Sequence, residues 1–235
     1  FWVISGSLAL DKLILVLCLS FAVGPSFMKA MNYAGKFPQL NYKITELEHL
    51  MDKPALKEGS AKFSGVNRDV QFENVRFAYG EKEILHGVSL ELKQGTTTAL
   101  VGESGSGKST LAKLLVHYYD LNEGKIRIGG QDITDMSLEA LNNEVSYVSQ
   151  EQFLFNTSLY ENILIGKLDA KREEVLKAAK RARCDEFLKR LPDGIETIAG
   201  DGGKQLSGGE RQRISLARAI LKDAPIIVLD EATAF

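Results

Sequence analysis

The stretch "GESGSGKST", Gly102 to Thr110, constrains the fold of this chain more than any other. It matches G-x-x-x-x-G-K-[ST] in full, and it lies between "TTTALVG", which we predict as a short buried strand, and a predicted helix from Lys108 to about Tyr119. Glycines in such a loop let backbone N–H groups point inward around an anion, and the helix N-terminus adds its dipole. Because the context argues against a chance Gly/Ser loop, the sequence predicts a phosphate-binding loop.

Two side chains of this loop and a second segment form a predicted nucleotide site. Lys108 is expected to reach β- and γ-phosphate oxygens, and Ser109 to offer its hydroxyl to Mg²⁺. "IIVLDE", Ile226 to Glu231, is predicted to be a buried strand closed by two carboxylates. Asp230 would then lie near the Mg²⁺, and Glu231 could orient or deprotonate the attacking water. The alternative is a pair of acids at a strand end in solvent, which the phosphate-binding loop disfavours.

A second glycine-rich stretch, "LSGGERQR", opens a predicted helix near the end of the sequence. Ser207 followed by Glu210 fits a capping box, in which Ser is the N-cap and Glu the third helical residue. Gly208 and Gly209 then fall in the first turn, where backbone N–H groups have no partner within the helix. Those donors and the helix dipole favour an anion, so this stretch could be a second phosphate seat. The alternative is a glycine-rich turn before an ordinary helix.

Two further residues are weaker candidates. Gln150 ends the predicted strand "VSYVSQ", and its amide could reach Mg²⁺ or the attacking water, although such a residue is more often a solvated polar group. Tyr79 ends a predicted strand, and its ring could stack on a base, although a terminal aromatic is more often packing.

The first part of the chain has a different character, because Leu13 to Met28 is a run of 16 residues without a charge. Extended to Ala34, the run crosses only Lys29, and about 20 apolar residues suffice to span a bilayer. "FWVISGSLAL" reads as the end of an earlier apolar segment, with Asp11 and Lys12 in the turn between the two. A buried core helix and a secretory signal are the alternatives, and the preceding apolar segment argues against a signal.

Three lysines after the run, Lys29, Lys36 and Lys43, place that end on the cytoplasmic side. Helical spacing continues to Met51, and Pro54 is expected to stop the helix. We therefore predict the C-terminal part of a membrane domain over residues 1–56, a polar linker over 57–69 and a soluble domain over 70–235. In the soluble domain, two antiparallel strands come first, followed by strands that alternate with helices, which is typical of an α/β fold with a mainly parallel core sheet.

Composition excludes several other classes of protein. The formal net charge is −2, so no basic surface indicates nucleic-acid binding. The two cysteines, Cys18 and Cys184, form no disulfide framework or metal-ligand spacing, and the three histidines are scattered.

Taken in order, Tyr79, "GESGSGKST", Gln150, "LSGGE" and "IIVLDEAT" resemble the nucleotide-binding domain of an ATP-binding cassette (ABC) transporter. The resemblance covers Val70 to Phe235 and departs from the family's LSGGQ only at Glu210. The family's fold is a P-loop NTPase with a parallel core sheet, an antiparallel β subdomain and a helical subdomain. The fused membrane segment is similar to the last transmembrane helices of an exporter half-transporter.

The resemblance implies a role for each matching residue. Tyr79 would stack on adenine, Glu231 would be the catalytic glutamate, and Gln150 would contact Mg²⁺ and couple the site to the membrane domain. Asp230 and Ser109 would complete the metal site. The remaining residues would bind ATP: Gly102, Glu103, Ser104, Gly105, Ser106, Gly107, Lys108 and Thr110 as the Walker A loop, and Ser207, Gly208, Gly209 and Glu210 as the signature.

The resemblance also implies ATP-driven export. Two cassettes would close head to tail on ATP, each signature capping the nucleotide of the other, and hydrolysis would reopen them. The partner would be an identical or related half-transporter in the lipid of a plasma or inner membrane, multi-pass, with the cassette in the cytoplasm and no nucleic acid involved. The transported substrate stays open among lipids, peptides, drugs and siderophores.

Two alternatives belong to other classes. A soluble P-loop ATPase of the DNA-repair or translation-factor kind is disfavoured by the apolar run, and an ATP sensor without turnover is disfavoured by Glu231. We expect the sequence to be an internal part of a longer protein. The family's aspartate loop and switch histidine would follow Phe235, so we expect little hydrolysis by this stretch alone.

Overall fold

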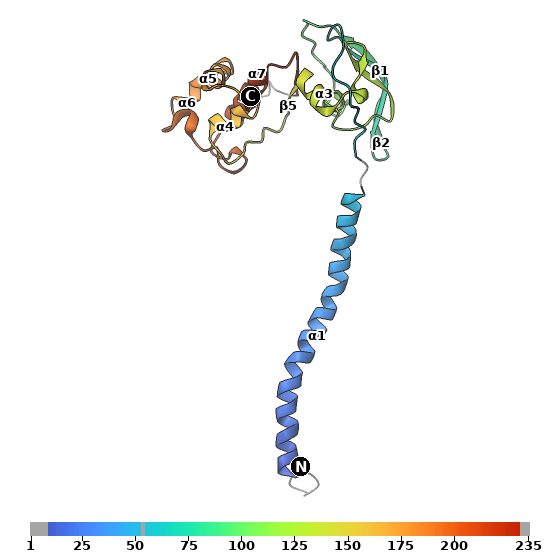
Figure 1. Ribbon diagram of the computed structural model, residues 1–235, viewed down its shortest axis with the longest axis vertical. Coiled ribbons are helices and arrows are strands. Elements are labelled where there is room, and N and C mark those ends of the chain that lie inside the picture. Colours follow the sequence, from blue (N-terminus) through green and yellow to red (C-terminus); the bar gives the residue numbers. More distant parts are fainter. Residues whose placement is uncertain (1–8, 53–54, 231–235) are drawn as a thin grey trace. The chain divides into compact units, whose positions relative to one another are not determined.

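The computed structural model describes residues 9–52 and 55–230. The chain divides into two units, Phe1–Ala55 and Leu56–Phe235 (Figure 1). In its described residues, the first unit is a single long helix, whereas the second combines two sheets with several helices.

The first unit contains α1, Leu10–Met51, which is 42 residues long. The prediction that Asp11 and Lys12 lie in a turn between two apolar segments is wrong, because both lie in the first turn of α1. An acidic side chain there interacts favourably with the positive end of the helix dipole, so the charge pair does not interrupt the helix. Residues 1–8, which were predicted to end an earlier apolar segment, lie outside the described residues.

Helix α1 is long and apolar enough to cross a membrane. At ~1.5 Å per residue it extends ~63 Å, about twice the hydrocarbon thickness of a bilayer. Leu15, Phe21 and Phe27 are exposed on it, as are most of its described side chains. Pro25 and Pro38 lie inside the helix, which continues past the apolar run to Met51, as its helical spacing predicts.

The second unit begins with a four-stranded antiparallel sheet in the order β2-β1-β3-β4. Its strands are β1 Val70–Tyr79, β2 Lys82–Leu92, β3 Glu123–Ile128 and β4 Gln131–Asp132. β1 buries Phe72 and Val75, an odd spacing that a bulge explains, because the register shifts between these residues and Asn74 has a φ of 46°. The bulge keeps the apolar side chains of β1 on one face of the sheet. Strands β1 and β2, the two predicted antiparallel strands, contribute this face to the core.

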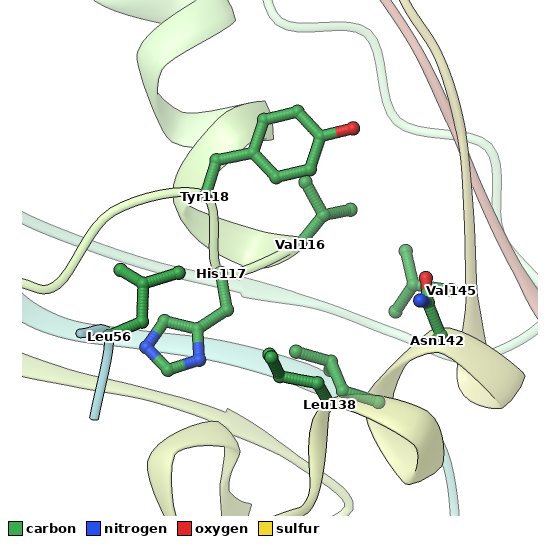
Figure 2. Close-up of a pocket in the computed structure, with 8 residues that line it drawn as sticks. Leu56, Val116, His117, Tyr118, Leu138, Asn142 and Val145 are labelled. Carbon is green, nitrogen blue, oxygen red and sulfur yellow. The ribbon is translucent and has the colours of Figure 1, made fainter. Parts of the chain in front are cut away.

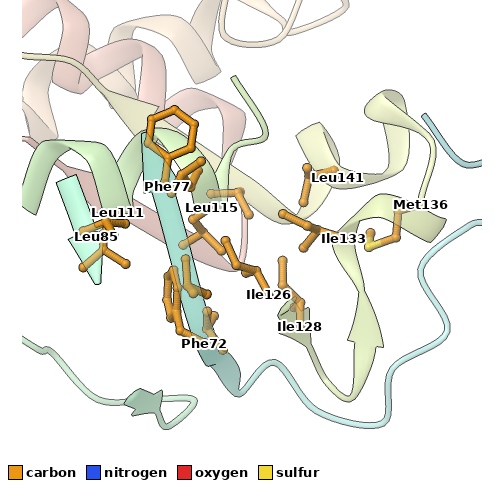
Figure 3. Packing of buried hydrophobic residues seen from close by; sticks show 14 residues of the cluster. Phe72, Phe77, Leu85, Leu111, Leu115, Ile126, Ile128, Ile133, Met136 and Leu141 are labelled. Atoms are coloured by element: carbon orange, nitrogen blue, oxygen red, sulfur yellow. The ribbon is translucent and has the colours of Figure 1, made fainter. Parts of the chain in front are cut away.

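That face packs against two helices and a 3₁₀ turn (Figure 3). These elements are α2 Lys108–Leu115, η1 Ile133–Asp135 and α3 Leu138–Glu144. Leu114, Ile126 and Ile128 have no exposed side-chain surface, so α2 is held firmly against the sheet. The helix that opens at the phosphate-binding loop therefore starts from a rigid base.

A second, parallel sheet pairs β5, Val145–Val148, with β6, Ile226–Leu229. Residues 96–102 were predicted as a buried strand, and this is wrong: they form no strand, and Val101 is 92% exposed. A strand needs a neighbour for its backbone N–H and C=O groups, and β5 and β6 pair with each other rather than with this segment. The prediction that the strand now labelled β6 is buried is also wrong, since Ile227 and Leu229 are each 51% exposed.

The remaining elements form a helical part with its own apolar cluster, which includes Leu159, Ile163, Phe187 and Ile214. Its helices are α4 Leu159–Leu164, α5 Arg172–Arg181, α6 Asp185–Leu188 and α7 Gly208–Lys222, with 3₁₀ turns η2 Gly194–Glu196 and η3 Asp201–Gly203.

Two helices end through a left-handed residue, and the first of them ends earlier than the sequence predicts. α2 ends at Leu115 rather than near Tyr119, because His117 has a φ of 56° and the next N–H, of Tyr118, reaches back to the Lys113 carbonyl. The same pattern at Arg183, with a φ of 58°, separates α5 from α6. Both are Schellman-type caps, formed here without glycine.

Residues 57–69, the predicted linker, belong to the second unit and form hydrogen bonds with its other elements. The backbone N–H of Ala61 donates to Asp135, and that of Ser137 donates to Ala61. The side chain of Glu58 accepts the N–H of Leu138 at the start of α3. This stretch therefore lies along η1 and α3.

Candidate functional site

Residues 102–106 of the predicted phosphate-binding loop are exposed, and the next residue, Gly107, is buried. Gly107 is the N-cap of α2, with a φ of 93°. A Cβ there would lie 2.6 Å from Cδ2 of Leu85 in β2, in addition to the cost of a left-handed backbone for any other residue. This position therefore requires glycine, both for the turn into α2 and for close approach to the sheet.

Lys108 folds back over the loop that precedes it. Its Nζ donates to the carbonyl oxygens of Gly102 at 2.9 Å and Glu103 at 2.7 Å, and to Oγ of Ser106 at 3.3 Å. The ammonium group thus stands at the loop's centre, with oxygen atoms around it. Phosphate oxygens are acceptors of the same kind with more negative charge, so they suit this position.

The next residue joins the loop to the second sheet. Oγ of Ser109 donates to Oδ1 of Asp230 at 2.7 Å, and the hydroxyl of Tyr147 donates to Oδ2 of the same carboxylate at 3.0 Å. The N–H of Asp230 donates to Val148, which extends the β5–β6 ladder by one residue and fixes the buried carboxylate. The sequence predicted that Ser109 and Asp230 lie near each other, and the structure brings them together.

Tyr147 remains a hydrogen-bond donor at neutral pH. Burial raises the pKa of its phenol, and the negative charge of Asp230 raises it further. The donor keeps one carboxylate oxygen occupied, and the other faces the Ser109 hydroxyl.

Ser109 and Asp230 fit Mg²⁺, which takes hard oxygen ligands and usually keeps several of its waters. Their oxygens already meet at hydrogen-bond distance, so a cation between them would need only a small separation of the two side chains. Gln150, the third predicted ligand, is exposed and lies two residues beyond the end of β5. Glu231, the predicted catalytic glutamate, lies outside the described residues.

Tyr79 lies at the end of β1 in a small aromatic cluster. Its ring contacts Phe77 and Tyr119 edge to face, with centroids 4.8 Å and 5.2 Å away. The side chain is 41% exposed, so it packs on one side and leaves ring surface for a ligand on the other.

The capping box predicted at the start of α7 is present. The N–H of Glu210 donates to Oγ of Ser207 at 3.3 Å, and Oε2 of Glu210 accepts from the N–H and hydroxyl of Ser207 at 2.8 Å and 2.9 Å. Gly208 and Gly209 form the first turn and are half-buried. No hydrogen bond between described residues uses their N–H groups, which point from a helix N-terminus.

The Glu210 carboxylate has a cation on its other side. Nη2 of Arg190 lies 2.8 Å from Oε1 of Glu210. Burial alone would raise the pKa of this carboxyl, but the bonds from Ser207 and the charges of Arg190 and Arg213 outweigh it, so the pKa is lowered. Glu210 is therefore ionised at neutral pH.

Arg218 connects α7 with the segment that follows Gln150. Its guanidinium donates to the carbonyl of Phe153 at 2.8 Å, and to the backbone and side-chain oxygens of Asn162, each at 2.6 Å. Burial lowers its pKa to about 10, so it stays charged at neutral pH. A groove of about 330 Å³ lies beside it, lined in part by Ser149, Glu151 and Lys222.

Another cavity, of about 200 Å³, lies at the end of α2 (Figure 2). His117 lines it together with Leu56, Leu138 and Asn142. None of the predicted site residues lines this cavity, so it is separate from the predicted nucleotide site.

Sequence reasoning missed Tyr147, Arg190 and Arg218. A signal for Tyr147 was present, because parallel pairing of β5 with β6 places Tyr147 beside Val228, two residues before Asp230. The two arginines act through contacts distant in the sequence, for which local patterns give no signal.

Comparison with known proteins gives a consistent match. A family model described as "ABC transporter" matches residues 85–234, more than half of the chain. A bacterial Atm1-family ABC exporter solved with ATP bound has a TM-score of 0.76 at 40% sequence identity, covering 83% of this chain and 35% of that one.

Curated relatives include two proteins named ATP-dependent lipid A-core flippase. The one from Legionella pneumophila (strain Paris) is 52% identical over 169 residues, which are 72% of this chain and 29% of the relative. The one from Chromohalobacter salexigens is 47% identical over 191 residues, which are 80% of this chain and 33% of the relative. The chain thus spans about a third of the length of these relatives.

Proposed function

The chain belongs to the ABC transporter family, as its motifs predict, and we propose that it drives export across a membrane by binding and hydrolysing ATP. Its second unit has the α/β P-loop NTPase fold of that family's ATPase domain. The observation that carries the proposal is the contact of Ser109 with Asp230 at 2.7 Å, together with the ammonium of the preceding residue, Lys108, on the loop carbonyls. This arrangement suits Mg²⁺ and a triphosphate together.

In the proposed site, bound Mg²⁺ would neutralise charge on the phosphates. Ser109 and Asp230 would hold it, with Gln150 as a further ligand and the link to the membrane domain. Lys108 would exchange the loop carbonyls for β- and γ-phosphate oxygens, because these carry more charge. Tyr79 would stack on adenine, and Glu231 would orient the attacking water.

We propose that the signature acts across two cassettes. Gly208 and Gly209 offer N–H groups at a helix N-terminus, where an anion is favoured. Among described residues, no hydrogen bond joins Ser207–Glu210 to the phosphate-binding loop Gly102–Thr110. A γ-phosphate held by the loop of a second, identical or related half-transporter would complete both sites and close the dimer.

The membrane part of the proposal rests on α1, whose exposed apolar side chains suit lipid. We propose that residues 1–56 end the membrane domain of a multi-pass protein in a plasma or inner membrane, that 57–69 connect it to the cassette, and that 70–235 lie in the cytoplasm. The relatives named flippases make a lipid the first substrate class to test.

The deciding experiment measures ATP turnover by the Glu231→Gln variant of the intact transporter in a lipid bilayer. ATP turnover should fall at least about 100-fold while ATP binding persists, because a general base contributes about that much. The variant should accumulate an ATP-bound dimer, measured by cross-linking between cassettes. Unchanged turnover would refute the role of Glu231 and the proposed hydrolysis mechanism.

A lipid-flipping assay with the wild-type protein in proteoliposomes tests the substrate class separately. ATP-dependent movement of a labelled lipid supports a lipid substrate, whereas ATP turnover that no lipid stimulates argues for another class.

A further inference from the structure

The signature helix carries a negative charge where the proposed function needs an anion to bind. Glu210 is the third residue of α7, and its ionised carboxylate lies in the same turn as Gly208 and Gly209. A carboxylate at this position stabilises the helix N-terminus, but it also repels a phosphate that approaches the same donors. The familiar glutamine at this position would carry no such charge.

The two carboxylate oxygens of Glu210 have different partners. Oε2 is held by the N–H and hydroxyl of Ser207, whereas Oε1 contacts Nη2 of Arg190 at 2.8 Å. Arg213 on the same helix forms its ion pair with Glu186 instead, at 2.6 Å. Among the described residues, Arg190 is therefore the cation that pairs with Glu210.

Arg190 is placed for this contact by the helical core. Its N–H donates to the carbonyl of Phe187, whose side chain is buried in the helical cluster. The Arg190 side chain itself is 72% exposed, against 21% for Glu210, so the guanidinium covers the carboxylate from the solvent side. A guanidinium has five N–H donors, so one contact leaves most of them available.

We propose that Arg190 is a positioning residue of the signature, which neutralises Glu210 and makes the tip of α7 acceptable to the triphosphate held by the partner cassette. The inference rests on the proposed function. It also explains how a signature ending in glutamate can serve in place of one ending in glutamine, since the ion pair presents no net charge.

The test measures ATP turnover by the intact transporter in a lipid bilayer as a function of ATP concentration. R190A should raise KM for ATP about 2- to 5-fold, the range expected for one charge near a helix terminus, and leave kcat within about twofold. R190E should have a larger effect, and R190K should be close to wild type. Because the effect is electrostatic, the R190A defect should shrink as salt is added.

A double-mutant cycle separates this role from a structural one. In an E210Q background there is no carboxylate to neutralise, so R190A should then change KM no further. R172A is the matched control, because Arg172 forms an exposed ion pair with Glu196 at 2.7 Å in the same helical part.

The outcomes distinguish the two proposals. If the wild-type protein turns over ATP but R190A changes KM no more than R172A does, this inference alone is overturned. It is also overturned if the effect of R190A on KM persists in the E210Q background. A wild-type protein without ATP turnover overturns the proposed function and this inference with it.

Discussion

The two halves of the candidate nucleotide site are prepared differently. In the phosphate-binding loop, the groups expected to bind the ligand bind each other: Lys108 contacts the carbonyls of Gly102 and Glu103, and Ser109 contacts Asp230. At the signature, Ser207 and Glu210 satisfy each other and leave the donors of the first turn open. ATP must therefore replace existing bonds in the first half, whereas the second half is already arranged.

The largest expected effect comes from removing the cation of the first half. Lys108→Ala should weaken ATP binding by roughly 10- to 100-fold, since hydrogen bonds to charged groups contribute about 1.5–3 kcal/mol. Equilibrium binding of a fluorescent ATP analogue to the intact protein measures it. Lys167→Ala removes an exposed lysine paired with Glu174 and should have no effect. Equal losses in the two variants would contradict a role for Lys108 in phosphate binding.

The second-largest effect is expected from removing a proposed Mg²⁺ ligand beside the phosphate-binding loop. Asp230→Asn keeps the size of the side chain but removes its charge, so the benefit of Mg²⁺ to ATP binding should fall about tenfold. Binding measured with Mg²⁺ and with EDTA separates this from a general loss. Asp223→Asn is the control, because Asp223 caps α7 in a left-handed conformation that asparagine tolerates. A loss that is equal with and without Mg²⁺ would argue against a metal ligand.

In the second half, Ser207→Ala should open the first turn of α7 without unfolding the domain. Loss of an N-cap costs about 1 kcal/mol, or about fivefold in local opening. Hydrogen exchange of peptides from residues 207–213 in the intact protein measures it. Ser137→Ala removes the corresponding cap of α3 and should change exchange there instead. If Ser207→Ala leaves exchange in α7 unchanged, the second half is not held by its cap.

The smallest effect is a dependence of the same cap on pH. The folded-state pKa of Glu210 is lowered, so its contribution is fully present above the ordinary value of 4.5 and is lost as pH falls through the lowered pKa. Exchange of the first turn of α7, corrected for the intrinsic rate, should therefore rise in acid below that value. E210Q should abolish the dependence, and a persisting one would assign it to another group.

The sequence predicted the parts of the site that local chemistry decides. The loop into α2 and the Ser207–Glu210 cap follow from residue types at fixed spacing, and the structure contains both. Local chemistry could not decide whether residues 96–102 form a strand, because a strand depends on neighbours from elsewhere in the chain. The early end of α2 and the end of α5 depend on His117 and Arg183 in left-handed conformations, which are uncommon for residues other than glycine.

Long-range contacts were the other limit. Tyr147 and Asp230 are 83 positions apart, and Arg190 and Glu210 are 20 apart, so neither pair lies within one helix or hairpin. The sequence motifs paired Asp230 with Ser109 and Glu210 with Ser207, but they gave no indication of Tyr147 and Arg190, the second partner of each carboxylate.

Arg218 has a mechanical consequence for the molecule. Its side chain extends from α7, and the guanidinium donates hydrogen bonds to Phe153, three residues after Gln150, and to Asn162 of α4. We therefore expect a tilt of α7, which begins at Gly208, to move the backbone around Phe153 with it, because the tilt would otherwise break these hydrogen bonds.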